Sequence, residues 1–211
     1  MIIAVDGPAA SGKGTIAKAL ARHYGLPHLD TGLLYRAVGL SVARTGGDPD
    51  EEKSALAACY FDDTLLDDPD LRTEATGALA SRVSVHGAVR AALVQRQRDF
   101  ANQDGGAVLD GRDIGTVIAP DADAKLFITA SARERARRRA LEMESRGVAA
   151  DIESIVAEIE ARDARDMGRA NAPLVQADGA DLLDTSDLAI DAAVQRAIAL
   201  VDAQLERHRK G

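Results

Sequence analysis

The sequence predicts a single α/β domain built on a parallel sheet that helices cover on both faces. Its length of 211 residues suits one domain of this class and leaves little room for a second. Short apolar runs indicate buried strands at 2–5, 107–109, 125–129 and, more weakly, 181–183. Helical patterns fill the intervals, at about 31–44, 73–103, 131–146, 151–169 and 187–208.

Composition limits the core and the partners. Apolar residues make up 46% of the chain but aromatic residues only 3%, so Ala, Leu, Val and Ile must fill the core. The net charge of −8 argues against binding to a nucleic-acid polymer. The acids gather in residues 48–74, whereas residues 133–139 hold five Arg and one Glu. This basic run is consistent with binding of a small anion or with a solvated helix face.

Cellular context follows from what the sequence lacks. No apolar run approaches the roughly 18 residues that cross a bilayer, and the first residues lack the basic segment of a signal peptide. We therefore expect a cytosolic protein without membrane contact. The single cysteine, Cys59, excludes an internal disulfide and is expected to be a small buried side chain. The four histidines, which we expect to be structural or exposed, have no metal-like spacing.

The strand at 2–5 leads into a glycine-rich loop and then a helix at 13–24. In this order, backbone N–H groups of the loop can cradle phosphates, while Lys13 reaches the β and γ phosphates. Because Gly14 follows the lysine, the hydroxyl that could reach Mg²⁺ belongs to Thr15. A glycine-rich turn without a ligand is the alternative. The predicted phosphate loop comprises Gly7, Pro8, Ala9, Ala10, Ser11, Gly12, Lys13, Gly14 and Thr15.

The strand at 107–109 ends in Asp110. An acid at the carboxyl end of a buried strand beside a phosphate loop can hold Mg²⁺, usually through water, although such acids also cap helices. Arg112 and Asp113 follow at the edge where parallel sheets bind their ligands.

The helix predicted from 151 changes character along one face. Its apolar stripe starts at Ile152 and runs to Ile159, and at 3.6 residues per turn it continues into Arg162 or Asp163, then Asp166 and Arg169. Buried charges must pair with one another or face a charged ligand. Ion pairs on a helix that has rolled outward would give the same pattern.

These motifs together resemble the bacterial cytidylate kinase family, in family order from about residue 2 to 185. The resemblance rests on the phosphate loop, Asp30-Thr31-Gly32, Tyr35-Arg36, Asp110-Gly-Arg-Asp113, the arginine run at 162–169 and Ala172-Pro173-Leu174. It implies a three-layer P-loop kinase fold in one domain, with a core of about 1–30, 104–130 and 173–211. Two small mobile excursions would be a monophosphate-binding region at about 31–103 and a lid at about 131–172. Relatives often carry a β-rich insert, for which residues 59–74 leave little room.

The resemblance implies Mg²⁺-dependent transfer of the ATP γ-phosphoryl group to CMP or dCMP, in pyrimidine nucleotide metabolism, by a monomer. The acceptor site would comprise Thr31, Tyr35, Arg36, Ser81, Arg90, Arg112, Asp113, Asp166 and Arg169. The catalytic cations would be Lys13, Arg112, Arg162, Arg165 and Arg169, assisted by Arg135 and Arg139, and the magnesium site Thr15 and Asp110. A kinase for UMP, AMP or an alcohol, and a nucleotide-dependent switch, are the alternatives.

Overall fold

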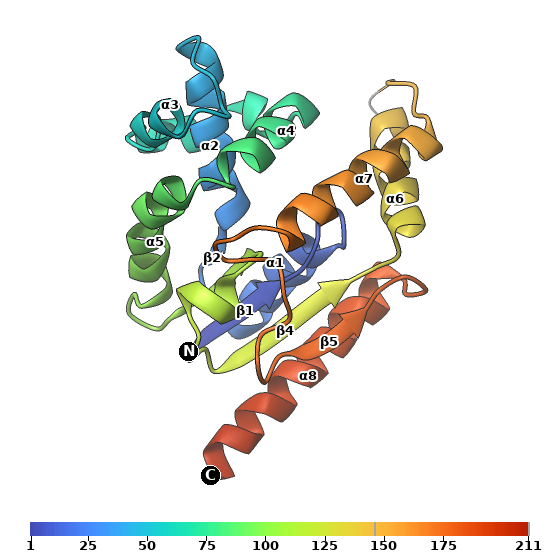
Figure 1. Cartoon of the computed structure of the whole chain (residues 1–211). Helices are drawn as coiled ribbons and strands as arrows, with labels where there is room; N and C mark the ends of the chain where they lie inside the picture. The colour runs from blue at the N-terminus through green and yellow to red at the C-terminus, as the bar shows by residue number, and fades with distance from the viewer. Residues whose placement is uncertain (146, 211) are drawn as a thin grey trace.

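A five-stranded parallel sheet forms the centre of the molecule, in the order β2-β3-β1-β4-β5 (Figure 1). The computed structural model describes residues 1–145 and 147–210. The strands are β1 (Ile2–Asp6), β2 (His28–Asp30), β3 (Ala107–Gly111), β4 (Ala124–Thr129) and β5 (Asp181–Asp184). All pair in parallel, and β1 pairs with β3 from Ile2 opposite Ala107 to Asp6 opposite Gly111.

Helices cover both faces of the central strands. On one face, α1 (Lys13–Tyr24) and α8 (Ile190–Lys210) pack on side chains such as Val5 and Leu126. On the other, α5 (Gly87–Ala101) and the wide helical turn η3 (Ile114–Ile118) pack on Ala4 and Leu109. Residues of opposite faces alternate along a strand, so β1 and β3 are apolar on both faces until each reaches a buried aspartate, Asp6 or Asp110, near its carboxyl end.

Two groups of helices rise from the carboxyl edge of the sheet (Figure 1). One contains α2 (Thr31–Arg44), α3 (Glu52–Ala57) and α4 (Glu74–Val83), with the short 3₁₀ turns η1 (Asp63–Asp67) and η2 (Pro69–Arg72). The other contains α6 (Ala132–Ser145) and α7 (Ile152–Met167). The carboxylate of Asp30 accepts a hydrogen bond from the N–H of Gly32 and so caps α2 directly after β2.

Several element boundaries differ from the expected ones. The single helix expected at 73–103 is wrong: α4 and α5 are separate, with the break at residues 84–86. There Ser84 bonds back to the carbonyl of Ser81, and the ring of His86 lies 2.9 Å from the carbonyl of Pro49. Strand β2 was not expected, because His-Leu-Asp has a single apolar residue. The expected strand at 107–109 extends to Gly111, and α8 begins at Ile190 rather than at 187.

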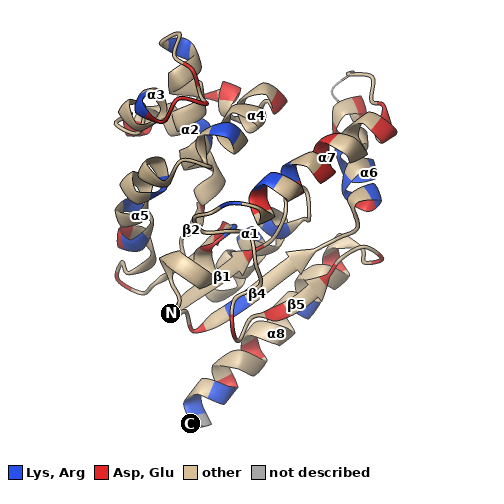
Figure 2. Cartoon of the chain, viewed as in Figure 1, with Lys and Arg blue, Asp and Glu red and all other residues tan. Residues whose placement is uncertain are grey.

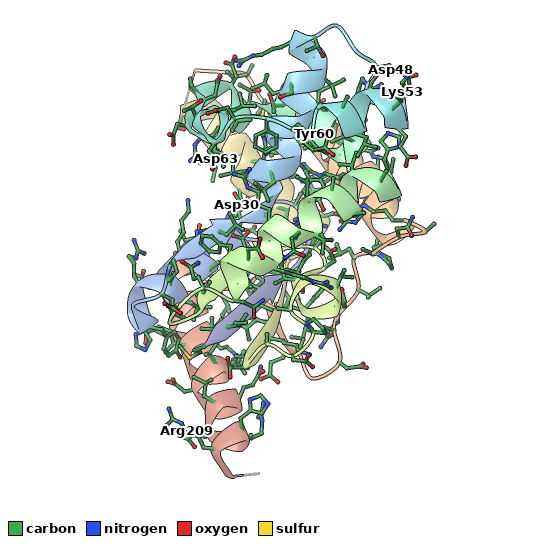
Figure 3. The ribbon with its side chains drawn as sticks, turned by 90° about the vertical axis from the view of Figure 1, so that its left-hand side faces the viewer. Asp30, Asp48, Lys53, Tyr60, Asp63 and Arg209 are labelled. Atoms are coloured by element: carbon green, nitrogen blue, oxygen red, sulfur yellow. The ribbon has the colours of Figure 1, made fainter. Side chains whose placement is uncertain are left out.

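The acidic segment 48–74 is helical and lies away from the sheet. In the side view of Figure 3, Asp48 and Asp63 lie above Asp30, which marks the edge of the sheet. No strand forms in the described part of this segment, as expected from its length. Cys59 is half-buried, and burial raises the pKa of its thiol to about 11. Among the described residues, no helix is long and apolar enough to cross a membrane.

A close contact between α2 and α4 generates a stability prediction. A Cβ added at Gly39 would lie 2.8 Å from the Cβ of Leu79 and 3.0 Å from the backbone nitrogen of Ala80. We expect Gly39→Ala to lower the free energy of unfolding by about 1 to 3 kcal/mol, because the helices must move apart. Urea unfolding measures this, with Ala43→Ser on the exposed side of α2 as the control. Equal stability of the two variants would contradict the contact.

Candidate active site

The phosphate loop joins β1 to α1 and is fixed by packing. Gly7 has a φ of +153°, and a Cβ there would lie 2.0 Å from the backbone oxygen of Ile128. Its small size is therefore required for packing against β4. Gly12, with a φ of +87°, begins α1. The hydroxyl of Ser11 is buried and has no hydrogen-bond partner in the part of the chain that the structure describes, so this loop has an unused donor.

The positive charge of Lys13 is only partly balanced by nearby carboxylates. Its Nζ donates to the carbonyl of Pro8 at 3.3 Å. Burial lowers the pKa of Lys13 to about 8, and the nearby charge of Arg112 acts in the same direction, more strongly than Asp110 opposes it. An anion beside the ammonium group would favour the charged form.

Two adjoining cavities meet at this loop. The larger, of about 650 Å³, is lined by the loop, by α6 and by the start of α8. The smaller, of about 220 Å³, lies between the loop, α2, α4, α5 and the end of α7. Ala9, Ala10, Arg36 and Arg162 line both cavities. Two ligands could therefore meet at a wall that contains two arginines.

The smaller cavity carries an excess of positive charge. Figure 2 shows basic and acidic residues alternating on α7 where its C-terminal end approaches the sheet. Among the described residues, four carboxylates line the cavity: Asp30, Asp110, Asp113 and Asp166. Six basic residues also line it: Lys13, Arg36, Arg90, Arg112, Arg162 and Arg169.

Asp166 holds two of these arginines. Its Oδ2 accepts from Arg112 Nε at 2.9 Å, and its Oδ1 forms an ion pair with Arg169. Asp166 is 1% exposed. Burial alone would raise its pKa, but Arg112, Arg169 and Arg162 outweigh that effect and lower the pKa to about 2. The charged stripe of α7 thus faces inward, and its members both pair with one another and line a cavity.

Arg162 is less well paired. Burial lowers its pKa to about 9, with a further contribution from Arg112, and its buried Nε has no hydrogen-bond partner within residues 1–145 and 147–210. Asp163, one position on, instead binds Arg135 of α6 at 2.6 Å. Of the two residues that could continue the apolar stripe, Arg162 is therefore the one at the cavities and Asp163 holds α6 to α7.

A second buried pair lies deeper in the smaller cavity. Arg90 Nη2 is 2.5 Å from Asp113 Oδ2, and the guanidinium lies 5.3 Å from the centre of the Tyr35 ring. Ser81 is buried in the same wall and lies 3.3 Å from the Nε of Arg165. The structure therefore brings together Ser81, Arg90 and Asp113, which lie far apart in the sequence.

Asp110 has a neighbour that sequence reasoning missed. Its Oδ1 lies 2.7 Å from His28 Nε2, a contact that no motif in the sequence indicated. The backbone carbonyl of Asp110 accepts from the hydroxyl of Thr31 at 2.8 Å. Thr15, by contrast, is exposed and lines the larger cavity, whereas Asp110 lines the smaller one. Burial and the charge of Asp110 raise the pKa of Asp30.

The basic run of α6 divides between the two interpretations of the sequence. Arg137 is exposed and pairs with Glu134 on its own helix, as a solvated face would. Arg138 reaches inward and donates to the hydroxyl and the carbonyl of Thr185 beside the larger cavity. Arg139 forms an ion pair with Glu74 of α4, across the cavity. The sequence did not predict that Thr185 lies at this cavity, because the short strand before it has acidic flanks and was only weakly indicated.

The Asp166 cluster generates a prediction about pH and stability. Because the folded pKa of Asp166 is depressed from 3.8 to about 2, its contribution is fully present above 3.8 and is lost as the pH falls towards 2. We expect Asp166→Asn to lower the free energy of unfolding near neutral pH by about 3 kcal/mol, because two buried arginines lose their counter-ion. The difference from the original protein should shrink below pH 3.8.

Urea unfolding at a series of pH values measures this difference, with exposed Asp121→Asn as the control. A difference that stayed constant across the series would show that the ion pairs do not carry the effect.

Comparisons with known proteins agree on one family. Residues 3–203 match the family Cytidylate kinase. A cytidylate kinase of Xanthobacter autotrophicus is 58% identical over 204 residues, 97% of this chain and 98% of that protein. A cytidylate kinase of Rhodopseudomonas palustris is 55% identical over 204 residues, 96% of this chain and 97% of the relative. A crystal structure of an uncharacterized protein from Eubacterium ventriosum has the same fold, with a TM-score of 0.53 and 18% identity over 96% of this chain and 99% of the other. The chain belongs to the cytidylate kinase family.

Proposed function

We propose that this chain transfers the γ-phosphoryl group of ATP to CMP or dCMP, giving ADP and CDP or dCDP. The observation that carries the proposal is the pair of adjoining cavities that share Arg36 and Arg162 beside the phosphate loop. A nucleotide-dependent switch needs one nucleotide site, whereas a transferase needs two that meet. Membership of the cytidylate kinase family supports CMP as the acceptor.

The larger cavity would take the donor. Its phosphates would lie along the loop from Gly7 to Thr15, where Ser11 lines the larger cavity, and would reach towards Lys13, which lines the adjoining smaller one. The nucleoside would extend between α6 and the start of α8, towards Leu141 and Ile190. These apolar side chains are 53% and 67% exposed, and a base stacked between them would cover them.

The smaller cavity would take the acceptor. Arg36, Arg112 and Arg169 would hold its phosphate, since guanidinium groups bind phosphate oxygens in a bidentate manner. Arg36 already donates to the carbonyls of Leu71 and Thr73, which aim its planar group. Thr31 and Tyr35 would complete the phosphate end, and Asp166 would accept from the ribose hydroxyls.

Cytosine would be read by the buried pair and the serine beside it. The carboxylate of Asp113 would accept from the exocyclic amine at N4, while Arg90 and Ser81 would donate to N3 and O2. Arg90 and Asp113 are each less than 6% exposed, so their charges are poorly solvated and well placed to discriminate. Uracil presents a carbonyl to Asp113, which cannot donate to it.

Transfer would proceed in line and needs no general base, because the acceptor phosphate is already ionised near neutral pH. Catalysis then depends on holding two polyanions together and on offsetting the charge of a loose transition state. The positive charge would come from Lys13, Arg112, Arg162, Arg165 and Arg169.

We infer that residues 131–172 move as a lid and residues 31–103 as a monophosphate-binding region, both of which exclude water on closure. Arg135 and Arg139 would assist from the lid.

Magnesium fits the donor set at the loop. The described residues contain no group of three acids, histidines or cysteines that could hold a metal without other ligands. Phosphate oxygens and water would therefore complete a site to which Asp110 and Thr15 contribute. The Oδ1 of Asp110 contacts His28, whereas its Oδ2 lies towards the loop. A Cβ added at Gly14 would be 3.8 Å from that Oδ2. When bound there, Mg²⁺ would offset the negative charge of the phosphates during transfer. A cytosolic location and a monomeric state stay predictions.

The proposal is tested by ADP release across a panel of nucleoside monophosphates. We expect CMP and dCMP to give the highest kcat/KM, and UMP to be lower by about tenfold or more, because uracil has no amine to donate to the buried Asp113 carboxylate. Incubation with ATP alone is the control for hydrolysis. Highest kcat/KM with AMP or UMP would refute the cytosine assignment, and ADP release independent of any acceptor would favour a switch.

Two variants, one in the last turn of α7 and one just after its end, separate catalysis from stability. Arg169→Ala should lower kcat together with kcat/KM, because a phosphate contact that strengthens during transfer is lost. Asp166→Asn should mainly raise the KM for CMP, and raise it less for dCMP if the carboxylate reaches the 2′-hydroxyl. Steady-state constants with both nucleotides, measured well below the melting temperature, decide the matter. A fall in melting temperature with unchanged kinetics in both variants would show that these charged residues form ion pairs with a structural role only.

A further inference from the structure

Asp6, the last residue of β1, caps a helical turn that belongs to another part of the chain. It is 3% exposed and lines neither cavity. Its Oδ1 accepts from the backbone N–H of Ile114 and its Oδ2 from that of Gly115, both at 2.8 Å. These are the first two amides of η3, which have no partner within their own turn. One carboxylate thus satisfies both of them across 108 positions of sequence.

The backbone of Asp6 is a fixed point. It lies in the central strand, in register between Gly111 of β3 and Phe127 of β4. The next residue, Gly7, is packed so closely against Ile128 that a Cβ could not be accommodated. The Asp6 side chain therefore fixes the start of η3 in position relative to the sheet and to the start of the phosphate loop.

This contact leaves Asp113 available for other partners. Asp113 occupies the N-cap position of η3, where an aspartate side chain ordinarily accepts from the amides of its own turn. Here it makes no such bond. Since Asp6 already satisfies the amides of Ile114 and Gly115, the Asp113 carboxylate turns to Arg90 and faces the smaller cavity.

We propose that Asp6 is a positioning residue that fixes the carboxylate of Asp113 and thereby sets the preference of the acceptor site for cytosine over uracil. The inference rests on the proposed function and deepens it. Without the cap from Asp6, the Asp113 side chain would compete for the free amides of its own turn and would leave the pocket.

The test is Asp6→Asn. Asparagine keeps one acceptor oxygen but turns an NH₂ group towards the other amide, so Ile114 or Gly115 loses its partner. Burial raises the pKa of Asp6 to about 7, so the assay is run at about pH 8, where the original carboxylate is ionised. We expect the KM for CMP to rise about tenfold and the ratio of kcat/KM for CMP over UMP to fall about tenfold. The affinity for a non-hydrolysable ATP analogue, measured by calorimetry, should change by less than about twofold.

Asp123→Asn is the matched control. Its Oδ2 accepts from the backbone N–H of Ile2 at 2.6 Å, at the opposite end of the same strand. This substitution also removes a carboxylate bond to the backbone, and should lower the melting temperature while leaving the CMP over UMP ratio unchanged. If Asp6→Asn behaves in the same way as this control, the positioning role is overturned.

A second measurement keeps the proposal open to refutation if Asp6→Asn does not fold. In the unmodified protein, binding of CMP should slow amide exchange at Ile114 and Gly115 more than at Ile2. Equal effects at all three amides would overturn the proposal. The unmodified protein must first phosphorylate CMP, and if it does not, the proposed function fails. If it does, and the ratio of kcat/KM for CMP over UMP is unchanged in Asp6→Asn, only the role of Asp6 is refuted.

Discussion

The parallel pairing of β1 with β3 determines where every part of the site lies. Because Asp6 is opposite Gly111, the chain leaves both strands at the same edge and at the same level. One exit becomes the phosphate loop, and the other becomes the segment from Arg112 to Ile118. Ligands of parallel sheets bind at this edge because loops from neighbouring strands meet there. The helices above it then add arginines from outside the sheet.

Those arginines make the cleft suited to anions. Carboxylates of the protein form ion pairs with several of them. Asp166 pairs with Arg112 and Arg169, and Asp113 pairs with Arg90. The pairing is incomplete: burial lowers the pKa values of Lys13 and Arg162, and the buried Nε atoms of Arg162 and Arg169 find no hydrogen-bond partner among the described residues. Buried charge without full compensation is unfavourable. Phosphate oxygens at this position would supply the missing acceptors, and stability and binding are therefore linked.

Sequence patterns predicted the elements whose signals are local. The strand, glycine loop and helix from 2 to 24 required only apolar patterning and glycine positions, and the phase of α7 placed Asp166 on the buried side. Signals that depend on distant contacts were missed. Strand β2 has three residues, two of them polar, so only its pairing with β3 makes it a strand. The contact of His28 with Asp110 follows from that pairing. The break between α4 and α5 has no proline or glycine before Gly87, and depends on bonds such as that of His86 to the Pro49 carbonyl.

The central claim is that two anionic nucleotides occupy two adjoining cavities at the same time. Calorimetric titration of CMP into protein saturated with a non-hydrolysable ATP analogue tests it most directly. The account predicts that CMP binds with a stoichiometry of about one, and at least as tightly as without the analogue, because Arg36 and Arg162 line both cavities and closure brings them to both phosphates. Loss of CMP binding in the saturated protein would show that the two nucleotides compete for one site, and would contradict the account.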